Sequence, residues 1–236
     1  RDAGNWDAGG GAGGSILIEC ARLEGSGFCT ADGGAGSDDG GAGAGGRVAI
    51  HYDDDTGYTA HTSCTAGGGA EGGGVDKTPY GNGNCGSCVF VDTKGTPDPA
   101  DDELHIYNDC RITQDALECG RLELHDGATF FVDSHGAGDV ATSIQVNGDC
   151  LIPSNCGMSA DGLGYAHAQG PGAGETSGGG AGGGGYGGDG GDGGGGDGGS
   201  AYGDPSSPSD CGSGGGNRDG NRWGGSGGGA VILMVS

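Results

Sequence analysis

Short runs of alternating apolar and polar residues recur through the first two-thirds of the chain. In Arg121–His125, for example, Leu122 and Leu124 would point to one side of an extended backbone and their neighbours to the other. This period of two is typical of β-strands with one buried face. The pattern predicts strands at Ser15–Cys20, Arg47–Tyr52, Cys88–Asp92, Leu104–Tyr107, Arg121–His125, Thr129–Asp133 and Ser143–Val146. No stretch has the 3.6-residue apolar period of a helix, so we expect an all-β fold with essentially no helix.

Turn-forming pairs separate the short strands between residues 104 and 163. Asp126-Gly127 and Asn147-Gly148 are two of them, and their spacing fits a sandwich, a barrel or a β-solenoid. An internal echo favours the solenoid, because Thr30-Ala-Asp-Gly33 and Ser159-Ala-Asp-Gly162 each follow a strand and lead into glycine. Repeated units that stack on their neighbours are typical of solenoids. We therefore predict a β-solenoid-like fold, a parallel β-helix of short strands.

Glycine dominates residues 171–230, where half of the positions are Gly and none is Leu, Ile, Val or Phe. A flexible Gly/Ser linker is the plain interpretation. However, Tyr186, Asp189 and Asp192 stand three apart with only Gly between them, and three residues per turn is the period of a polyproline II helix. Bare backbone on the other faces can bond to neighbouring segments at a distance that a Cβ would prevent. We predict an ordered, polyglycine-II-like bundle; the Gly-X-Y register of collagen is absent.

Charge and hydropathy exclude two classes of partner. The chain has 33 acidic residues against 9 Lys plus Arg, a formal charge of -24, so it repels phosphate backbones and we expect no nucleic-acid binding. The longest apolar run, Ala230–Val235, is far shorter than the roughly 20 residues of a bilayer span, so we expect no membrane insertion. The first residue is Arg1 and not Met, from which we expect a mature or excised piece of a precursor.

Cysteine is abundant in a chain with few aliphatic residues. An even number of cysteines in such a chain is typical of disulfide-linked proteins from an oxidising, extracellular compartment. The ten candidates are Cys20, Cys29, Cys64, Cys85, Cys88, Cys110, Cys119, Cys150, Cys156 and Cys211. Cys85-x-x-Cys88 has zinc-ligand spacing, but no second pair accompanies it. We expect disulfides whose pairing the sequence leaves open.

Several glycine motifs occur in a characteristic order along the chain. They are Gly13-Gly-Ser-Ile16, Ser159-Ala-Asp-Gly162, Gln169-Gly-Pro-Gly-Ala-Gly174, Gly185-Tyr-Gly-Gly188 and Gly224-Gly-Ser-Gly-Gly-Gly-Ala230. In this order the chain resembles a repeat of very large, secreted, glycine-rich surface proteins. The resemblance implies tandem repeats and an extracellular structural or surface-coat role. The ten cysteines and the acidic stretches at Asp53–Asp55 and Asp98–Glu103 depart from that family.

Together these features predict one disulfide-stapled repeat unit over residues 1–236. It would comprise a β-rich part at 15–163 with glycine-rich insertions, a glycine-rich part at 164–229 and a terminal strand at 230–236. An exposed terminal strand is a template for the next copy. We expect an extracellular structural protein, secreted or part of a cell-surface appendage, whose units add head to tail into a filament or coat and whose main partner is itself.

Two other functions fit parts of the sequence. A cell-surface adhesin would grip glycan rings with Tyr186, Tyr202 and Trp223, although aromatic residues in glycine loops also serve as packing between backbone layers. A polysaccharide-degrading β-helix enzyme needs paired carboxylates, or calcium with a basic residue, on one face. With so many acids, chance pairs carry no information, and the six histidines are dispersed along the sequence. We expect no catalysis.

One carboxylate cluster is dense enough to suggest a metal. Asp53, Asp54 and Asp55 follow one another directly after a strand, and calcium takes oxygen ligands from such clusters. A solvated acidic turn is the alternative, and we favour it. No cofactor other than calcium is indicated.

Overall fold

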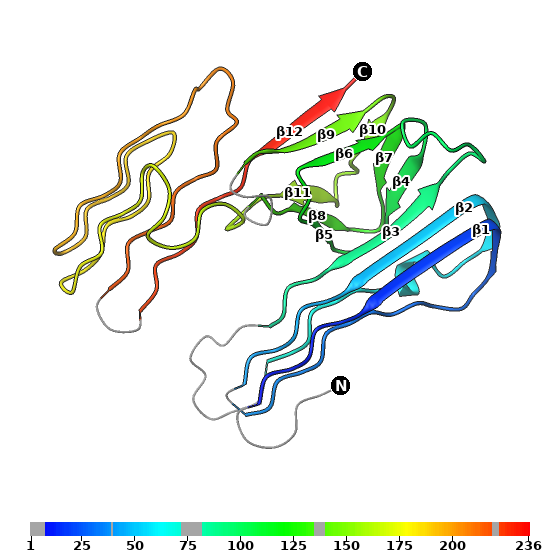
Figure 1. The fold of residues 1–236 in the computed structure, drawn as a ribbon, viewed down its shortest axis with the longest axis horizontal. Coiled ribbons are helices and arrows are strands. Elements are labelled where there is room, and N and C mark those ends of the chain that lie inside the picture. Colours follow the sequence, from blue (N-terminus) through cyan, green and yellow to red (C-terminus); the bar gives the residue numbers. More distant parts are fainter. Residues whose placement is uncertain (1–7, 39, 72–81, 135–139, 219–221) are drawn as a thin grey trace.

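The computed structural model describes residues 8–38, 40–71, 82–134, 140–218 and 222–236. These residues contain no α-helix, only one short 3-10 turn at His61–Ser63, so the all-β prediction is confirmed. The strands are β1 (Ser15–Gly25), β2 (Arg47–Tyr58), β3 (Ser87–Asp92), β4 (Glu103–Ile106), β5 (Cys110–Ile112), β6 (Ala116–Cys119), β7 (Arg121–Leu124), β8 (Thr129–Val132), β9 (Thr142–Val146), β10 (Cys150–Leu151), β11 (Gly157–Ser159) and β12 (Val231–Val235). Figure 1 shows a β-rich body from which two groups of extended segments project.

From β4 onward the chain visits three sheets in the same order three times. β4, β5 and β6 are followed by β7, β8 and β9, and then by β10, β11 and β12; each later strand pairs in parallel with its counterpart in the preceding round. The resulting sheets have the orders β4-β7-β10, β11-β8-β5 and β12-β9-β6, the first being continuous with β3. Leu122, Phe130 and Ile144 come from the three sheets and are all fully buried, in one shared core.

The N-terminal strands form a second core. β1, β2 and β3 pair in parallel, so that Ile18, Ile50 and Phe90 lie side by side on the inward face. Ile50 and Phe90 are almost completely buried there. β3 then pairs with β4 in the antiparallel sense, which joins the two cores into one six-stranded sheet.

The alternation pattern located every long strand. All seven predicted runs are strands, and the expected terminal strand is β12. The pattern missed β5, β6, β10 and β11, which have only two to four residues each. Two or three residues are too few to display a period of two, and in β6 the apolar Leu117 and Cys119 stand beside the turn residues that break the pattern; each of these strands is held by its parallel pairing with one neighbouring strand.

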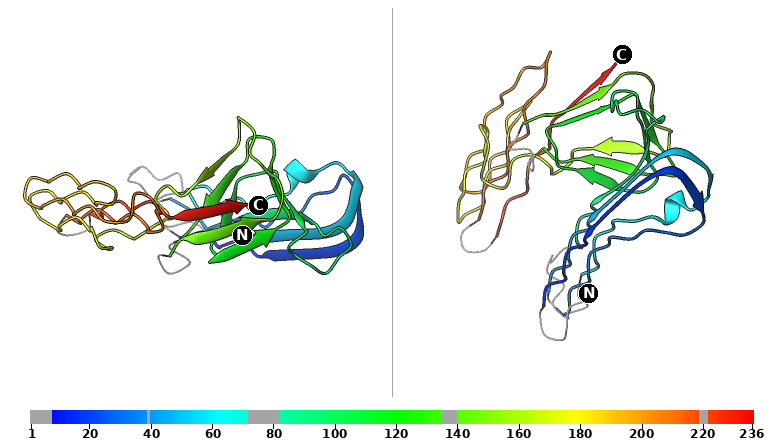
Figure 2. Two further views of the ribbon diagram at one scale, coloured as in Figure 1. Left: turned by 90° about the horizontal axis from the view of Figure 1, so that it is seen from above. Right: turned by 45° about the vertical axis from the view of Figure 1, so that its right-hand side comes forward.

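Glycine-rich backbone forms two arms beside the β body. The first arm consists of stretches between residues 8 and 86, and the second of residues 164–229; both views in Figure 2 show their extended segments running side by side. In the second arm, the N–H of Gly183 donates to the carbonyl of Gly191, Gly190 donates to Gly199, and Gly199 donates to Gly183, at 2.8–2.9 Å. Three segments are thus bonded to one another through backbone alone. The prediction confined such order to 164–229 and treated the first arm as insertions in the β-rich part.

Close approach of the segments explains why these positions are Gly. A Cβ on Gly13 would lie 1.9 Å from the carbonyl oxygen of Ala31, and one on Gly227 would lie 1.8 Å from that of Gly212. No side chain fits at these distances. Each backbone hydrogen bond contributes about 1 kcal/mol net, which is comparable with the roughly 0.5–1 kcal/mol extra cost of ordering Gly instead of Ala.

Among the described residues, no helix has the length and apolar character of a transmembrane span.

Candidate functional site

The two ends of the stacked strands leave inward-facing side chains uncovered. On β9, Ile144 and Val146 are fully buried, whereas their neighbours on β12, Leu233 and Val235, are 38% and 51% exposed. The difference arises because β12 pairs with β9 on one edge and with no described strand on the other. This end of the core is therefore open.

The opposite end, at β1, has the same character. Val48 and Ile50 of β2 are buried, while the residues paired with them on β1, Ile16 and Ile18, remain partly exposed. β1 is an edge strand of the six-stranded sheet. Its outward-facing Leu17 is 64% exposed. Stacked-strand proteins normally end in a polar capping layer, and neither end of the described chain has one.

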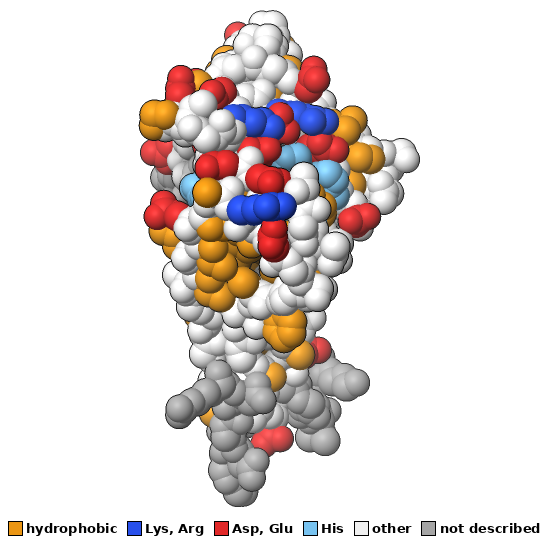
Figure 3. Space-filling view, turned by 90° about the vertical axis from the view of Figure 1, so that its right-hand side faces the viewer, with side chains coloured by type: hydrophobic (Ala, Val, Ile, Leu, Met, Phe, Trp, Pro, Cys, Tyr) orange, Lys and Arg blue, Asp and Glu red, His pale blue; other side chains and the backbone are white. Residues whose placement is uncertain are grey.

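A cluster of histidines and carboxylates lies on the outer face of β4 and β7. The parallel register places His105 directly opposite Glu123 and Glu103 opposite Arg121. His125 follows two residues after Glu123 and therefore projects on the same face. Figure 3 shows histidine side chains among acidic and basic ones on this side of the molecule. His105 Nδ1 and His125 Nε2 are 3.1 Å apart.

Burial keeps these imidazoles in their neutral form. Burial and then the neighbouring His125 lower the pKa of His105, although Glu123 and Glu103 act in the opposite direction. Burial is also the main cause that lowers the pKa of His125, opposed by Glu123 and Asp126. A neutral imidazole has one nitrogen free to accept a hydrogen bond or to ligate a metal. His105, Glu123 and His125 form a group whose candidate ligand atoms all lie within 4.8 Å of one another.

An arginine and a row of aromatic rings enclose this cluster. Arg121 Nη2 lies 2.7 Å from Glu123 Oε2, and Arg121 Nη1 lies 3.6 Å from Glu103 Oε2. The Tyr107 ring stacks on His125 with centroids 4.2 Å apart, and His61 stacks on the other rings at 4.6 Å from Tyr107. The rings fix the imidazole orientations. The cluster is half-buried.

A repeated tripeptide in the sequence marks this cluster. The tripeptide Glu-Leu-His occurs twice, at Glu103-Leu-His105 and Glu123-Leu-His125. The two copies lie on adjacent strands, shifted by two residues in register. Histidines that are dispersed in the sequence are thus brought together by the repeat of the fold.

The three carboxylates proposed for calcium have different partners. Asp53 accepts a hydrogen bond from the hydroxyl of Thr93, and Asp54 accepts one from the backbone N–H of Thr56. Asp55 Oδ2 lies 2.8 Å from His61 Nε2. Consecutive strand residues point to opposite faces, so Asp54 is directed away from the other two. Among the described residues these three carboxylates do not form a metal-type group, and calcium binding here stays a prediction.

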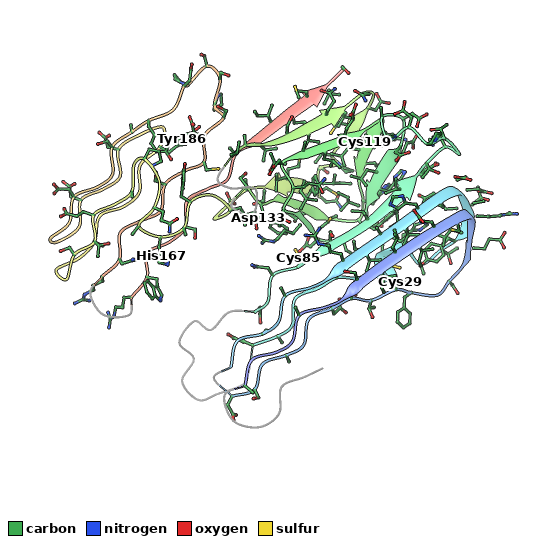
Figure 4. All side chains as sticks on the ribbon, in the orientation of Figure 1. Cys29, Cys85, Cys119, Asp133, His167 and Tyr186 are labelled. Atoms are coloured by element: carbon green, nitrogen blue, oxygen red, sulfur yellow. The ribbon has the colours of Figure 1, made fainter. Side chains whose placement is uncertain are left out.

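The aromatic residues proposed as glycan ligands lie at two separate places. Tyr186 and Tyr202 meet edge to face with centroids 5.1 Å apart, beside a pocket of about 310 Å³ that Pro205 and Pro208 help to line. The hydroxyl of Tyr202 donates to the carbonyl of Cys211, which ties it to the glycine arm. Trp223 lies instead against His167, with the two rings tilted and their centroids 4.7 Å apart. Figure 4 shows Tyr186 and His167 apart on this arm. Tyr186 and Tyr202 thus pack against each other, whereas Trp223 is 69% exposed, and glycan binding by these residues stays a prediction.

All ten cysteines lie among the described residues, and their pairing into disulfides stays a prediction. The strand pattern explains their positions, because Cys64, Cys88, Cys110 and Cys119 occupy buried core sites where a small apolar side chain fits. Two of the ten come together in a way that suits pairing: the N–H of Cys29 donates to Cys64 Sγ at 3.3 Å. Cys88 lies in strand β3 and Cys85 two residues before it, and neither joins the metal-type cluster above.

Comparison of the chain with protein-family models, with curated protein sequences and with solved structures finds no match. Its function must therefore be argued from its own residues.

Proposed function

We propose that this chain is an extracellular structural protein, one unit of a filament or surface coat in which units stack head to tail. The observation that carries the proposal is the open core at both ends. Leu233 and Val235 are exposed on the inward face of β12, and Ile16 and Ile18 are partly exposed on the inward face of β1; no described strand pairs with the outer edge of β12 or β1. Burying such surface against a second unit is favourable by about 25 cal/mol per Å².

The finer architecture that supports stacking is a parallel β-helix of three rounds. We interpret the three-fold repetition of β4–β6, β7–β9 and β10–β12 as such a helix, and the two arms as polyglycine-II-like bundles. Each round buries its apolar residues within itself and against the neighbouring rounds, so stability and growth both run along one axis. The resemblance to glycine-rich surface repeats supports the same interpretation.

The two open strands have matching local sequences. Gly13-Gly14 precedes β1, Gly45-Gly46 precedes β2, and Gly228-Gly229 with Ala230 precedes β12. β1 and β2 already pair in parallel, Ser15 opposite Arg47, with their glycine stretches bonded side by side. β12 is likewise preceded by two glycines. We infer that β12 of one unit pairs with β1 of the next unit, and that the glycine arms continue alongside.

The occupant of each end is therefore another copy of this unit, from a second molecule or from the next repeat of one longer chain. We infer no catalytic role. Phosphate backbones and bilayers are not expected partners, given the formal charge of -24.

A matched pair of lysine substitutions tests the interface. Leu233→Lys places a charge in the open core, whereas Met234→Lys places the same charge on the opposite face of β12. We expect wild-type chain and Met234→Lys to form long assemblies in sedimentation velocity and negative-stain electron microscopy, and Leu233→Lys to stay small. Wild-type chain that stays monomeric at high concentration, or equal assembly of both variants, would refute the proposal.

A further inference from the structure

The outer face of β4 and β7 combines residues that neither the strand core nor the stacking interface requires. Glu103, His105, Arg121 and Glu123 project from adjacent strands, and His125 follows β7 directly. Each of these side chains is half-buried beside the six-stranded sheet. Charged and imidazole groups are costly to bury unless they are paired or hold a ligand. Their arrangement therefore calls for an explanation.

We propose that His105, Glu123 and His125 bind one first-row divalent metal ion of the zinc, cobalt, nickel or copper type. The ligand set is two imidazole nitrogens and one carboxylate, with a fourth position open to water. Imidazole suits these metals, while calcium and magnesium prefer oxygen alone.

The distances fit such an ion. Two nitrogens bound to a tetrahedral metal at about 2.0–2.1 Å are separated by roughly 3.3 Å, and His105 Nδ1 and His125 Nε2 are 3.1 Å apart. Glu123 Oε2 lies 3.9 Å from His105 Nδ1. A rotation of the Glu123 side chain that brings its carboxylate toward both nitrogens completes the set.

The outer nitrogen of each imidazole has a carboxylate near it, although at more than hydrogen-bond distance. A ligating histidine normally turns its other ring nitrogen toward a carboxylate or carbonyl. His105 Nε2 faces Glu103 Oε2 at 3.6 Å, and His125 Nδ1 faces Glu123 Oε1 at 3.8 Å. Tyr107 stacks on the His125 ring and limits its rotation.

Arg121 sets the strength of the site. Its guanidinium lies 2.7 Å from Glu123 Oε2 and competes with a metal for that carboxylate. Replacing Arg121 with Gln removes the competing charge, so the metal should bind more tightly. A bound ion would link β4 to β7, two successive rounds of the stack, and so stabilise the strand body.

Cobalt(II) is the probe that separates this site from the ten thiols, because thiolate ligands give an intense near-ultraviolet charge-transfer band and nitrogen and oxygen ligands do not. We would titrate chelator-treated full chain with CoCl2 at neutral pH. His105→Gln and His125→Gln are the test variants, and His167→Gln, on the second glycine arm, is the matched control. Circular dichroism and a urea midpoint without metal establish that each variant is folded.

The proposal predicts one equivalent of cobalt with visible bands and no thiolate band. Affinity should fall at least tenfold in His105→Gln and His125→Gln, stay unchanged in His167→Gln and rise in Arg121→Gln. Cobalt should also raise the melting temperature of wild-type chain but not of His125→Gln. Absence of binding, binding through thiolate alone, or equal binding by folded His105→Gln and His125→Gln would mean that the two imidazoles only hydrogen-bond to each other.

Discussion

Neighbouring glycines in the arms have different surroundings although they share one residue type. A Cβ on Gly13 would collide with the carbonyl of Ala31, but a Cβ on Gly14 would meet nothing within 4 Å. The same contrast separates Gly227 from Gly225 in the other arm. Glycine is thus required at the positions that face another segment. At the open positions, a Cβ would meet no steric obstacle.

Alanine substitution at adjacent positions tests this distinction. Gly13→Ala should destabilise the fold by about 1–3 kcal/mol or more, the usual cost of overpacking. Gly14→Ala should be neutral or stabilising by up to about 1 kcal/mol, because it restricts the unfolded chain. Urea denaturation of both variants measures the difference, and equal midpoints would show that the close packing of the first arm is wrong.

Buried thiols make the fold sensitive to alkaline pH. Burial, and then the nearby Cys64, raise the pKa of Cys88 from its ordinary 9.0 to about 12. Because the unfolded thiol ionises first, this group's contribution to stability is complete below pH 9 and is lost as the pH rises toward 12. In reducing buffer, the urea midpoint should fall between pH 8 and pH 11. The fall should be smaller in Cys88→Ala, which lacks the group; an identical fall in both chains would contradict this.

One pair of thiols is placed to form a disulfide in an oxidising compartment. The backbone N–H of Cys29 donates to Cys64 Sγ, and the N–H of Thr65 donates to the carbonyl of Cys29 at 2.9 Å, so the two segments are neighbours. Exchange with glutathione disulfide would join Cys29 to Cys64 and release two glutathione thiols. We expect a peptide map after this treatment to show the Cys29–Cys64 link while the buried Cys110 stays reduced. A peptide map that lacks the Cys29–Cys64 link after this treatment would contradict the pairing.

At the scale of elements, the strands differ in what makes them predictable. β1, β2 and β9 are long enough for alternation to reveal them, and alternate residues of β2 and β9 are buried as that period predicts. β10 has only two residues and depends on β7 for its geometry. The His105–Glu123 contact follows from the register between β4 and β7. That register is a long-range property that a local period cannot express.

The core of the strand body should respond to truncation on one face only. Phe130 of β8 is fully buried between β5 and β11, whereas Phe131 points outward and lies under Arg111. Phe130→Ala should cost about 3–5 kcal/mol, and Phe131→Ala should cost far less. Thermal denaturation compares the two variants, and similar losses would mean that the strand is shifted by one residue.

At the scale of the whole molecule, two forces act on stacking units. The open cores at β1 and β12 favour contact, while a formal charge of -24 on each unit opposes it. Salt screens the repulsion over about 8–10 Å at physiological ionic strength and does not weaken apolar burial. Assembly should therefore strengthen as salt is added.

The most direct test of head-to-tail stacking mixes two variants that are each blocked at one end. Leu233→Lys removes the β12 end, and Ile16→Lys removes the β1 end. Each variant alone retains one working end and should stay monomeric. A mixture of the two should form heterodimers and nothing longer by sedimentation velocity, since one open β12 end meets one open β1 end. If each variant alone still forms filaments, or if the mixture remains monomeric while wild-type chain assembles, the pairing of β12 with β1 is contradicted.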